Sequence, residues 1–255
     1  MSCRAINIYS IAFLLFSHSI LLSVVIIGHR GASGYEPENT LRSFAKAIEL
    51  GVDMIEFDVH VCASGELVVI HDDTVDATTN GSGLVAEKTL GELQSLDAGK
   101  GEHIPTLSEV LDLVHRRVKV DIELKGLGTA GLVAHLIDEY VQHKDWTYDD
   151  FFVTSFARDE IEQFCVVCPQ VQTSHIIHSL EGNWHEVLDQ ITTKIFITSS
   201  EAITSEIVKY LHGRGMYVYV YTVNEYAELE RMQQLSVDGV FSDFPDRVQV
   251  IFANT

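Results

Sequence analysis

The sequence predicts an α/β fold, and within that class a (β/α)8 barrel, also called a TIM barrel. Segments with the composition and alternation of strands begin near positions 24, 54, 118, 151, 173, 194, 216 and 239. Segments with helical periodicity follow most of them, and eight parallel strands with interleaved helices close into a barrel. The chain has 255 residues, and one such domain commonly takes about 250 residues.

An apolar segment, residues 1–23, precedes the predicted barrel domain, residues 24–255. From Ala5 to His29 there is no Lys, Arg, Asp or Glu, and this run is long enough to span a bilayer. Its last part, from Val24 to Ile27, is predicted to be the first strand. Residues 1–23 resemble a secretory signal cleaved after Ser17-His18-Ser19. The alternatives are an uncleaved anchor, an extension that caps the bottom of the barrel, or a misassigned start. We therefore expect a protein that is either cytoplasmic or exported or anchored, with membrane contact through this segment.

The first helix is predicted to begin at Leu41, with Asn39 as its N-cap, and to end at Gly51. After the second strand and its hairpin, the regular pattern breaks up from Thr74 to His103 into loops around one short helix. We interpret residues 74–103 as a small insertion after the strand-2 hairpin.

The stretch from Glu56 to Asp72 places carboxylates and a histidine inside what otherwise has the composition of buried strands. Alternate side chains of a strand share a face, so Glu56 and Asp58 point the same way. Ser64-Gly65 is a two-residue turn signal, and the hairpin that it predicts places Asp58 opposite His71. The alternative is a salt-bridged ladder on an exposed strand, and the apolar flanking residues argue against it.

The remaining elements alternate regularly. The strand from Val118 to Leu124 has Asp121, Glu123 and Lys125 on one face and apolar residues on the other. Further strands are expected at residues 151–155, 173–177, 194–198, 216–223 and 239–242, and helices at residues 105–115, 129–143, 159–165, 184–191, 205–212 and 225–235.

The charge balance restricts the classes of partner. The chain has 17 Lys and Arg against 37 Asp and Glu, which gives a formal net charge of −20. This charge argues against nucleic acid and anionic membranes as partners, and it repels phosphate substrates at long range. Phosphate chemistry here needs local positive charge from a metal ion or from a few placed basic residues. Four cysteines do not form a disulfide scaffold at this length, and Cys165-Val-Val-Cys168 is interpreted as core packing.

Candidate metal ligands fall at the C-terminal ends of predicted strands, where (β/α)8 barrels carry their active sites. Glu56 and Asp58 lie on the second strand and Glu123 on the third. Three carboxylates that face one pocket raise one another's pKa unless a cation neutralises them. Oxygen ligands favour Mg²⁺ or Ca²⁺ over zinc, so the sequence predicts a divalent ion of this kind.

Basic and aromatic residues accompany the predicted metal ligands. Arg30 can hold a phosphate through two hydrogen bonds, and Lys125 can add a point charge. His29 and His71 suit a general acid and a general base on either side of a phosphorus atom, because histidine ordinarily titrates near pH 6.5. Which of them is the acid is left open. Tyr221 is first a barrel-lining residue, and it also borders the expected substrate site.

Together these motifs resemble the glycerophosphodiester phosphodiesterase family, and the resemblance covers nearly everything after Val24. The motifs are His29-Arg30-Gly31, Pro37-Glu38-Asn39-Thr40, Glu56-x-Asp58, His71-Asp72, Glu123-x-Lys125, Val153-Thr154-Ser155-Phe156, Tyr221-Thr222-Val223-Asn224 and the run from Asp238 to Asp246. The resemblance implies a metal-dependent barrel enzyme that hydrolyses deacylated phospholipids, a small-molecule substrate, to sn-glycerol 3-phosphate and an alcohol. It implies a metal held by Glu56, Asp58 and Glu123, an acid and a base at His29 and His71, and a phosphate held by Arg30.

Other functions stand as alternatives. A lysophospholipase D or a sphingomyelinase-like barrel acts on lipid phosphodiesters, and a non-catalytic barrel binds phosphate without reaction. The joint presence of both histidines, all three carboxylates and the arginine argues against the non-catalytic barrel. A glycosidase can use paired carboxylates, but it leaves Arg30 and the histidines without a role. Tyr221 stands where the family often has tryptophan, so the head group is left open, as is the oligomeric state.

Overall fold

The structure is a computed structural model that describes residues 24–180, 184–189, 191 and 193–253. The predicted export signal or anchor in residues 1–23 lies outside the described residues. Among the residues that are described, no helix combines the length and the apolar character that crossing a membrane requires.

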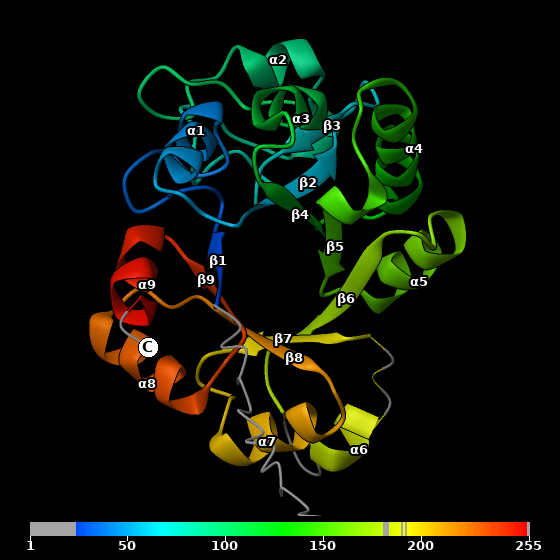
Figure 1. The fold of residues 1–255 in the computed structure, drawn as a ribbon. Coiled ribbons are helices and arrows are strands. Elements are labelled where there is room, and N and C mark those ends of the chain that lie inside the picture. Colours follow the sequence, from blue (N-terminus) through cyan, green and yellow to red (C-terminus); the bar gives the residue numbers. More distant parts are fainter. Residues whose placement is uncertain (1–23, 181–183, 190, 192, 254–255) are drawn as a thin grey trace, which may run out of the picture.

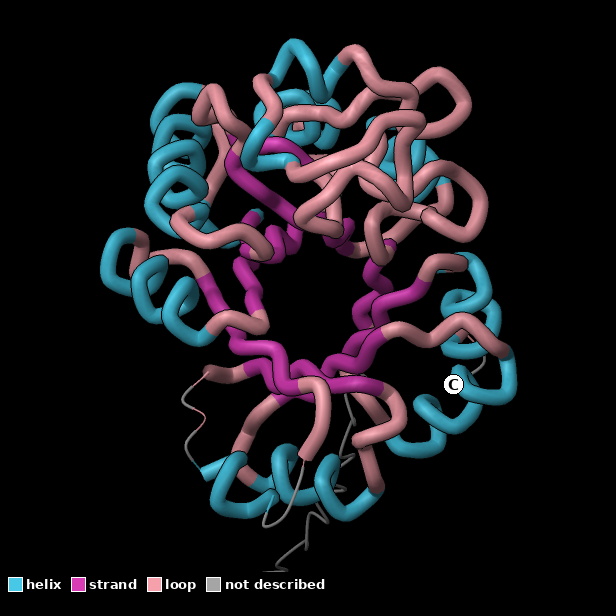
Figure 2. Tube along the Cα trace, turned by 180° about the vertical axis from the view of Figure 1, so that it is seen from behind, coloured by secondary structure: helices cyan, strands magenta, loops and turns pink. Residues whose placement is uncertain are grey.

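The strands form a closed barrel. In the described part of the chain, β1 pairs with β9 on one side and with β2 on the other, so the ring of eight parallel strands closes on itself. Helices surround the ring on its outside (Figure 2). The strands of the ring are β1 (Val25–Gly28), β2 (Met54–Val61), β4 (Lys119–Leu124), β5 (Phe151–Ser155), β6 (Gln172–Ile177), β7 (Ile195–Ser199), β8 (Tyr217–Tyr221) and β9 (Gly239–Ser242). The predicted (β/α)8 barrel is confirmed.

The helices around the ring are α1 (Leu41–Glu49), α3 (Leu107–Val114), α4 (Thr129–His143), α5 (Arg158–Val167), α6 (Trp184–Asp189), α7 (Ser205–Gly213), α8 (Tyr226–Leu235) and α9 (Pro245–Phe252). A 3-10 turn, η2 (Tyr148–Asp150), leads into β5. The sequence analysis did not predict α9, which begins with a proline, a residue that suits the first helical position. This helix packs against α8 and β1 (Figure 1).

Alternation along β2 separates two environments. Ile55 and Phe57 are fully buried in the apolar layer between the barrel and its helices. Glu56 and Asp58 point into the barrel, whose interior is otherwise filled by Ile27, Met54, Phe152, Ile176, Ile195, Ile197, Tyr219 and Phe241. A slip of one residue in β2 would move the carboxylates into the apolar layer, so the hydrophobic pattern fixes their direction.

The hairpin that follows β2 differs from the predicted one by one residue. In β3 (Leu67–Val69), Val69 pairs with Val59 and Leu67 pairs with Val61. The loop has three residues rather than two, because the Gly65 N–H donates to the Cys62 carbonyl at 3.0 Å and Gly65 takes a positive φ of 99°. The partner of Asp58 is therefore Ile70, whose N–H donates to the Asp58 carbonyl, and the predicted pairing of Asp58 with His71 is wrong.

The segment between β3 and α3 forms a small apolar cluster of its own. It contains a 3-10 turn, η1 (Val85–Glu87), and a short helix, α2 (Leu90–Gln94). Its buried residues include Val75, Val85 and Leu93, which pack on the β3 side of the hairpin. Lys100 Nζ joins this segment to the loop after β1 through the Tyr35 carbonyl at 2.9 Å and Glu36 Oε2 at 2.8 Å.

The start of α1 is also one residue from its predicted place. Thr40 is the N-cap, and its side chain accepts a hydrogen bond from the Ser43 N–H at 3.2 Å. Asn39 has a positive φ of 56° instead, and its side chain turns into the barrel. The prediction of Asn39 as the cap was therefore wrong. Asparagine suits its observed position for another reason, because it tolerates the left-handed conformation better than most residues do.

A buried glutamate holds the start of α4. Glu160 on α5 is 3% exposed. Its carboxylate accepts hydrogen bonds from the Gly128 N–H at 2.7 Å, the Ala130 N–H at 3.0 Å and the Thr129 hydroxyl at 3.2 Å. These N–H groups have no partner inside their own helix, and the positive end of the helix dipole favours a carboxylate there.

Replacing Glu160 by Ala is expected to lower the free energy of unfolding by about 2–3 kcal/mol, because it leaves several buried donors unpaired. Urea denaturation measures the difference. The matched control is Glu162→Ala on the same helix, which removes an exposed ion pair with Arg158 and is expected to change stability by less than about 0.5 kcal/mol. Equal effects of the two substitutions would contradict the capping role of Glu160.

Candidate active site

The predicted site residues come together at the C-terminal end of the barrel strands. A cavity of about 180 Å³ there is lined by His29, Arg30, Glu56, His71, Glu123, Lys125 and Tyr221, among others. Asp58 lies beside it, almost completely buried. A larger cavity of about 810 Å³ lies at the opposite end of the strands, and none of these residues lines it. We place the site at the smaller cavity because it brings together the predicted histidines, the basic residues and two of the three predicted metal ligands.

Three carboxylates converge inside the barrel. Glu56, Asp58 and Glu123 are 3%, 1% and 8% exposed, and one oxygen from each lies within 4.8 Å of the others. The neighbouring strands β2 and β4 place Asp58 and Glu123 in register with each other. Burial and the nearby carboxylates raise the pKa of Glu56 well above its ordinary value and that of Glu123 to about 7.

The oxygens of this cluster suit a hard cation. Glu56 Oε1 and Asp58 Oδ1 are buried and accept no hydrogen bond from any described residue. The other oxygen of Glu56 is fixed by the Arg30 N–H at 2.9 Å. Buried carboxylate oxygens without a donor are costly unless a cation compensates them, and Mg²⁺ and Ca²⁺ take oxygen ligands. The three carboxylates therefore fit a divalent metal ion.

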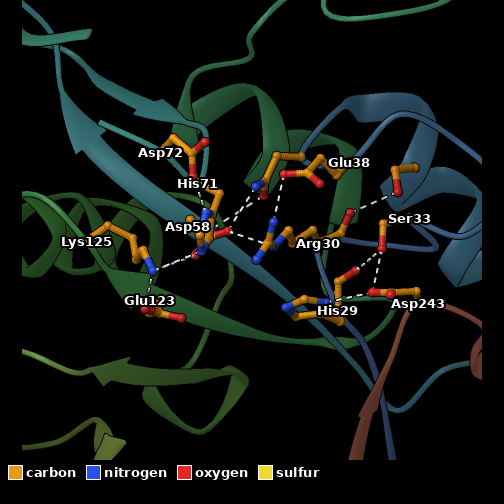
Figure 3. Close-up of polar contacts among 12 residues, drawn as sticks. His29, Arg30, Ser33, Glu38, Asp58, His71, Asp72, Glu123, Lys125 and Asp243 are labelled. Atoms are coloured by element: carbon orange, nitrogen blue, oxygen red, sulfur yellow. Dashed lines mark hydrogen bonds and ion pairs between the residues drawn. The ribbon is translucent and has the colours of Figure 1, made fainter. Parts of the chain in front are cut away.

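Two basic side chains flank the carboxylates. Arg30 Nη1 contacts Glu38 Oε1 at 2.8 Å, and its Nε lies 3.6 Å from Asp58 Oδ2. Lys125 Nζ lies 3.1 Å from Glu123 Oε1 and 3.9 Å from Asp58 Oδ1. Figure 3 shows both side chains pointing toward Asp58 from different sides. Two positive charges thus lie among the carboxylates of this site, in a protein whose net charge is strongly negative.

Each predicted catalytic histidine is paired with a carboxylate through Nδ1. His29 Nδ1 contacts Asp243 Oδ1 at 2.7 Å, and His71 Nδ1 contacts Asp72 Oδ1 at 2.6 Å. The same nitrogen is therefore engaged in both rings, which leaves Nε2 for other groups. Nε2 of His71 contacts Lys125 Nζ at 3.1 Å.

Asp243 is held more firmly than Asp72. Its carboxylate also accepts hydrogen bonds from the Ser33 hydroxyl at 2.8 Å and the Asn224 amide at 2.6 Å. Burial raises its pKa, but these hydrogen bonds and the contact with His29 outweigh that effect and lower it to about 2. Asp243 is therefore ionised at neutral pH. His71 is supported differently, because its carbonyl contacts the ring of His60 at 3.1 Å.

Asn39 orients one of the carboxylates. Its side-chain amide donates to Asp58 Oδ2 at 2.9 Å, and its side-chain oxygen accepts from the Asp58 N–H at 3.4 Å. Asn39, Asp72, Asn224 and Asp243 all lie within the quoted motifs, yet none of them was predicted to support the site: Asn39 was predicted only as a helix cap, and the other three were given no role. The signal available was their position directly next to predicted site residues or at the end of a strand.

Tyr221 borders the far side of the cavity. Its hydroxyl lies 3.1 Å from His178 Nδ1, and its ring meets that of Phe156 edge to face with centroids 5.9 Å apart. Lys125 Nζ lies 5.4 Å from the centre of the Phe156 ring. The cavity is therefore charged where β1, β2 and β4 end and aromatic near the ends of β5 and β8.

The chain is similar in sequence and in fold to known phosphodiesterases. Residues 29–247 match the model of the glycerophosphoryl diester phosphodiesterase family. A glycerophosphodiester phosphodiesterase of Caldanaerobacter subterraneus is 33% identical over 238 residues, which cover 88% of this chain and 96% of that protein. One of Bacillus altitudinis is 34% identical over 234 residues, which cover 87% and 95%. A phosphodiesterase of Oleispira antarctica, solved with the product sn-glycerol 3-phosphate, superposes with a TM-score of 0.82 at 27% identity, covering 91% of this chain and 97% of that one. The chain therefore belongs to the glycerophosphoryl diester phosphodiesterase family of phosphoric diester hydrolases.

Proposed function

We propose that the protein hydrolyses glycerophosphodiesters to sn-glycerol 3-phosphate and an alcohol, with a divalent metal ion and two histidines. The observation that carries the proposal is the meeting, in one cavity, of three buried carboxylates with two histidines that each have a carboxylate partner. The carboxylates alone also suit other metal enzymes. The paired histidines add the proton-transfer groups that cleavage of a phosphodiester needs.

Glu56, Asp58 and Glu123 are the proposed ligands of the metal, Mg²⁺ or Ca²⁺. A divalent ion bound there would neutralise phosphate oxygens and stabilise the charge that develops in the transition state. Arg30 and Lys125 supply further positive charge for the phosphate, Arg30 through its planar guanidinium and Lys125 as a point charge. Tyr221 is proposed to border the substrate on the side away from the carboxylates.

His29 and His71 are proposed to carry the protons. One takes a proton from the nucleophile, and the other gives a proton to the departing alcohol oxygen. If the nucleophile is water, the product is sn-glycerol 3-phosphate directly. If it is the neighbouring glycerol hydroxyl, a cyclic phosphate forms and water opens it in a second step. The carboxylate at each Nδ1 fixes the direction of the ring and stabilises the positive charge that the ring gains during the reaction.

The direct test is to incubate the purified protein with Mg²⁺ or Ca²⁺ and glycerophosphocholine and to follow the products by phosphorus NMR. We expect sn-glycerol 3-phosphate and choline. Formation of phosphocholine and glycerol would place the cleavage on the other side of the phosphorus and contradict the proposal. Metal binding with no turnover of any glycerophosphodiester would favour the non-catalytic phosphate-binding barrel.

Lysophospholipids are a second candidate substrate because two apolar side chains close to Lys125, one in sequence and one in space, are exposed. Leu127 follows Lys125 by two residues and is 88% exposed, and Phe156, which contacts Lys125, is 42% exposed. An acyl chain would cover such groups. The same assay with lysophosphatidylcholine compares the two substrates, and a higher kcat/KM for the lysophospholipid would identify a lysophospholipase D.

Replacing Asn39 by Ala is expected to weaken binding of Ca²⁺ about 10–100-fold, the usual effect of removing a group that orients a metal ligand. The physical reason is that Asp58 loses the amide that holds one of its oxygens. Isothermal titration calorimetry measures the affinity. Ser43→Ala is the matched control, because Ser43 also contacts the loop after β1 but not a proposed ligand. Unchanged affinity in Asn39→Ala would contradict the orienting role.

The affinity for the metal is expected to rise with pH. The pKa of Glu123 is raised to about 7, so below that pH a proton must leave before the carboxylate can bind the ion, and above it none has to. For one such proton the affinity for Ca²⁺ should be about tenfold higher at pH 8 than at pH 6. Calorimetry in two buffers of different ionisation enthalpy should also detect the released proton. Equal affinities at the two pH values would contradict this linkage.

A further inference from the structure

We infer that Lys125 is an internal counter-cation that weakens the hold of the carboxylates on the metal while it strengthens binding of the phosphate. The inference rests on the proposed function, because it takes the ligands of the metal from it. It adds that one side chain lowers the affinity of the site for the metal ion and raises its affinity for the phosphate.

The position of the ammonium group carries the inference. Lys125 Nζ lies 3.1 Å from Glu123 Oε1 and 3.9 Å from Asp58 Oδ1, so it contacts two of the three proposed metal ligands. Among the described residues, Lys125 Nζ also contacts His71 Nε2 at 3.1 Å. The side chain is mostly buried, so solvent screens these charges less than it screens exposed pairs. Figure 3 shows Lys125 reaching across toward Asp58, Glu123 and His71.

The signs of the two effects follow from the charges. A divalent ion that binds the carboxylates must share them with an ammonium group that already neutralises part of their charge, and the two cations repel each other. A phosphodiester brings negative charge into the same cavity and is attracted by the ammonium. Lys125 therefore makes metal binding weaker and anion binding stronger.

The same ammonium also reduces the destabilisation of the fold by the buried carboxylates when no metal ion is bound. Three buried carboxylates repel one another, and one cation inside the cluster reduces that repulsion. A site with such a counter-cation stays folded at low metal concentration and exchanges its ion readily. Arg30 plays this part less directly, since its Nη1 is occupied by Glu38 and its Nε lies 3.6 Å from Asp58.

The test compares Lys125→Met, which keeps the length of the side chain without its charge, with Lys125→Arg, which keeps the charge. Calorimetry at pH 8 measures the affinity for Ca²⁺ alone and, separately, that for sn-glycerol 3-phosphate in saturating Ca²⁺. We expect Lys125→Met to bind Ca²⁺ at least about tenfold more tightly than the wild type and the phosphate more weakly. Lys125→Arg should bind Ca²⁺ close to the wild-type affinity.

Thermal unfolding gives a second readout that does not depend on turnover. In a chelator, Lys125→Met should unfold at a lower temperature than the wild type, and Ca²⁺ should raise its Tm by a larger amount. Lys46→Met, which removes an exposed lysine paired with Glu49 far from the site, is the control and should change neither quantity.

Other outcomes overturn the inference. If Lys125→Met binds both Ca²⁺ and the phosphate more weakly, the lysine has a structural role. If only the phosphate affinity falls, Lys125 is a phosphate ligand and nothing more. A wild-type protein that binds Ca²⁺ but hydrolyses no glycerophosphodiester would contradict the proposed function and leave this inference standing, whereas a wild type that binds no divalent ion would remove both.

Discussion

Replacing Glu123 by Gln is expected to lower kcat/KM for glycerophosphocholine roughly 10³-fold, a loss of about 4 kcal/mol of transition-state stabilisation. The substitution keeps the size of the side chain and removes one of the three negative charges that converge within 4.8 Å. The amide oxygen is a weaker ligand for a divalent ion than a carboxylate oxygen is. The removal of one carboxylate is therefore expected mainly to weaken binding of the ion. We expect similar losses in Glu56→Gln and Asp58→Asn.

The measurement uses protein treated with a chelator and then titrated with Mg²⁺ or Ca²⁺. The wild type should lose activity in the chelator. It should regain activity when Mg²⁺, Ca²⁺ or either of the two is added back. Glu87→Gln, an exposed glutamate in η1, is the matched control and should behave as the wild type. Full activity of Glu123→Gln in chelator-treated buffer would refute the assignment of the metal ligands.

His29→Ala and His71→Ala are each expected to reduce kcat/KM on glycerophosphocholine by about 10²–10⁴-fold, but they should respond differently to the leaving group. We propose a division of the two roles from the contacts of each ring. An ammonium group can only donate hydrogen bonds, so His71 Nε2, at 3.1 Å from Lys125 Nζ, is an acceptor, and Nδ1 then donates to Asp72. This hydrogen-bond pattern supports the proposal that His71 is the base.

His29 has the surroundings of the acid. Asp243, ionised and held by Ser33 and Asn224, stabilises positive charge on the His29 ring. An aryl phosphodiester has a leaving group that needs no proton. On that substrate we expect His29→Ala to recover most of its loss and His71→Ala to recover little.

Steady-state kinetics on both substrates tests the assignment, together with the pH profile of kcat/KM. The wild type should give a bell-shaped profile on glycerophosphocholine, and His29→Ala on the aryl substrate should keep only the limb that reports the base. His103→Ala, which changes an exposed histidine beside Glu109, is the control. If both variants lose the same factor on both substrates, the histidines more simply position the metal or the phosphate.

Most of the barrel could be predicted from sequence because its signals are local. Each strand of the ring is short and contains β-branched or aromatic residues, and all of the strands that were predicted were found. The predicted pairing of the hairpin after β2 was wrong by one residue. Ser64-Gly65 suits both two- and three-residue loops, and only the pairing of the strands decides between them. His71 still reaches the cavity, since β3 ends at Val69 and the chain turns back toward the site.

The carboxylates at the centre of the candidate site could be predicted from sequence. The residues that hold the site residues in place could not. Glu56, Asp58 and Glu123 stand out because carboxylates are rare in buried strands. Asp243 carries no such signal: it follows the last strand, and its contact with His29 depends on the pairing of β9 with β1. Asn39 was assigned to a helix cap because its residue type suits a cap, and its actual role depends on a left-handed backbone that sequence does not reveal.

The pairing of β1 with β9 joins the first and the last strand of the ring, and His29 and Asp243, 214 residues apart in sequence, meet across that seam. A half-formed barrel can contain the proposed metal ligands on β2 and β4, but it cannot contain this pair until the last strand has been synthesised and has docked. Loss of the final strand during translation or by proteolysis would therefore leave His29 without its carboxylate partner. During refolding, turnover is therefore expected to recover only once β9 has paired with β1.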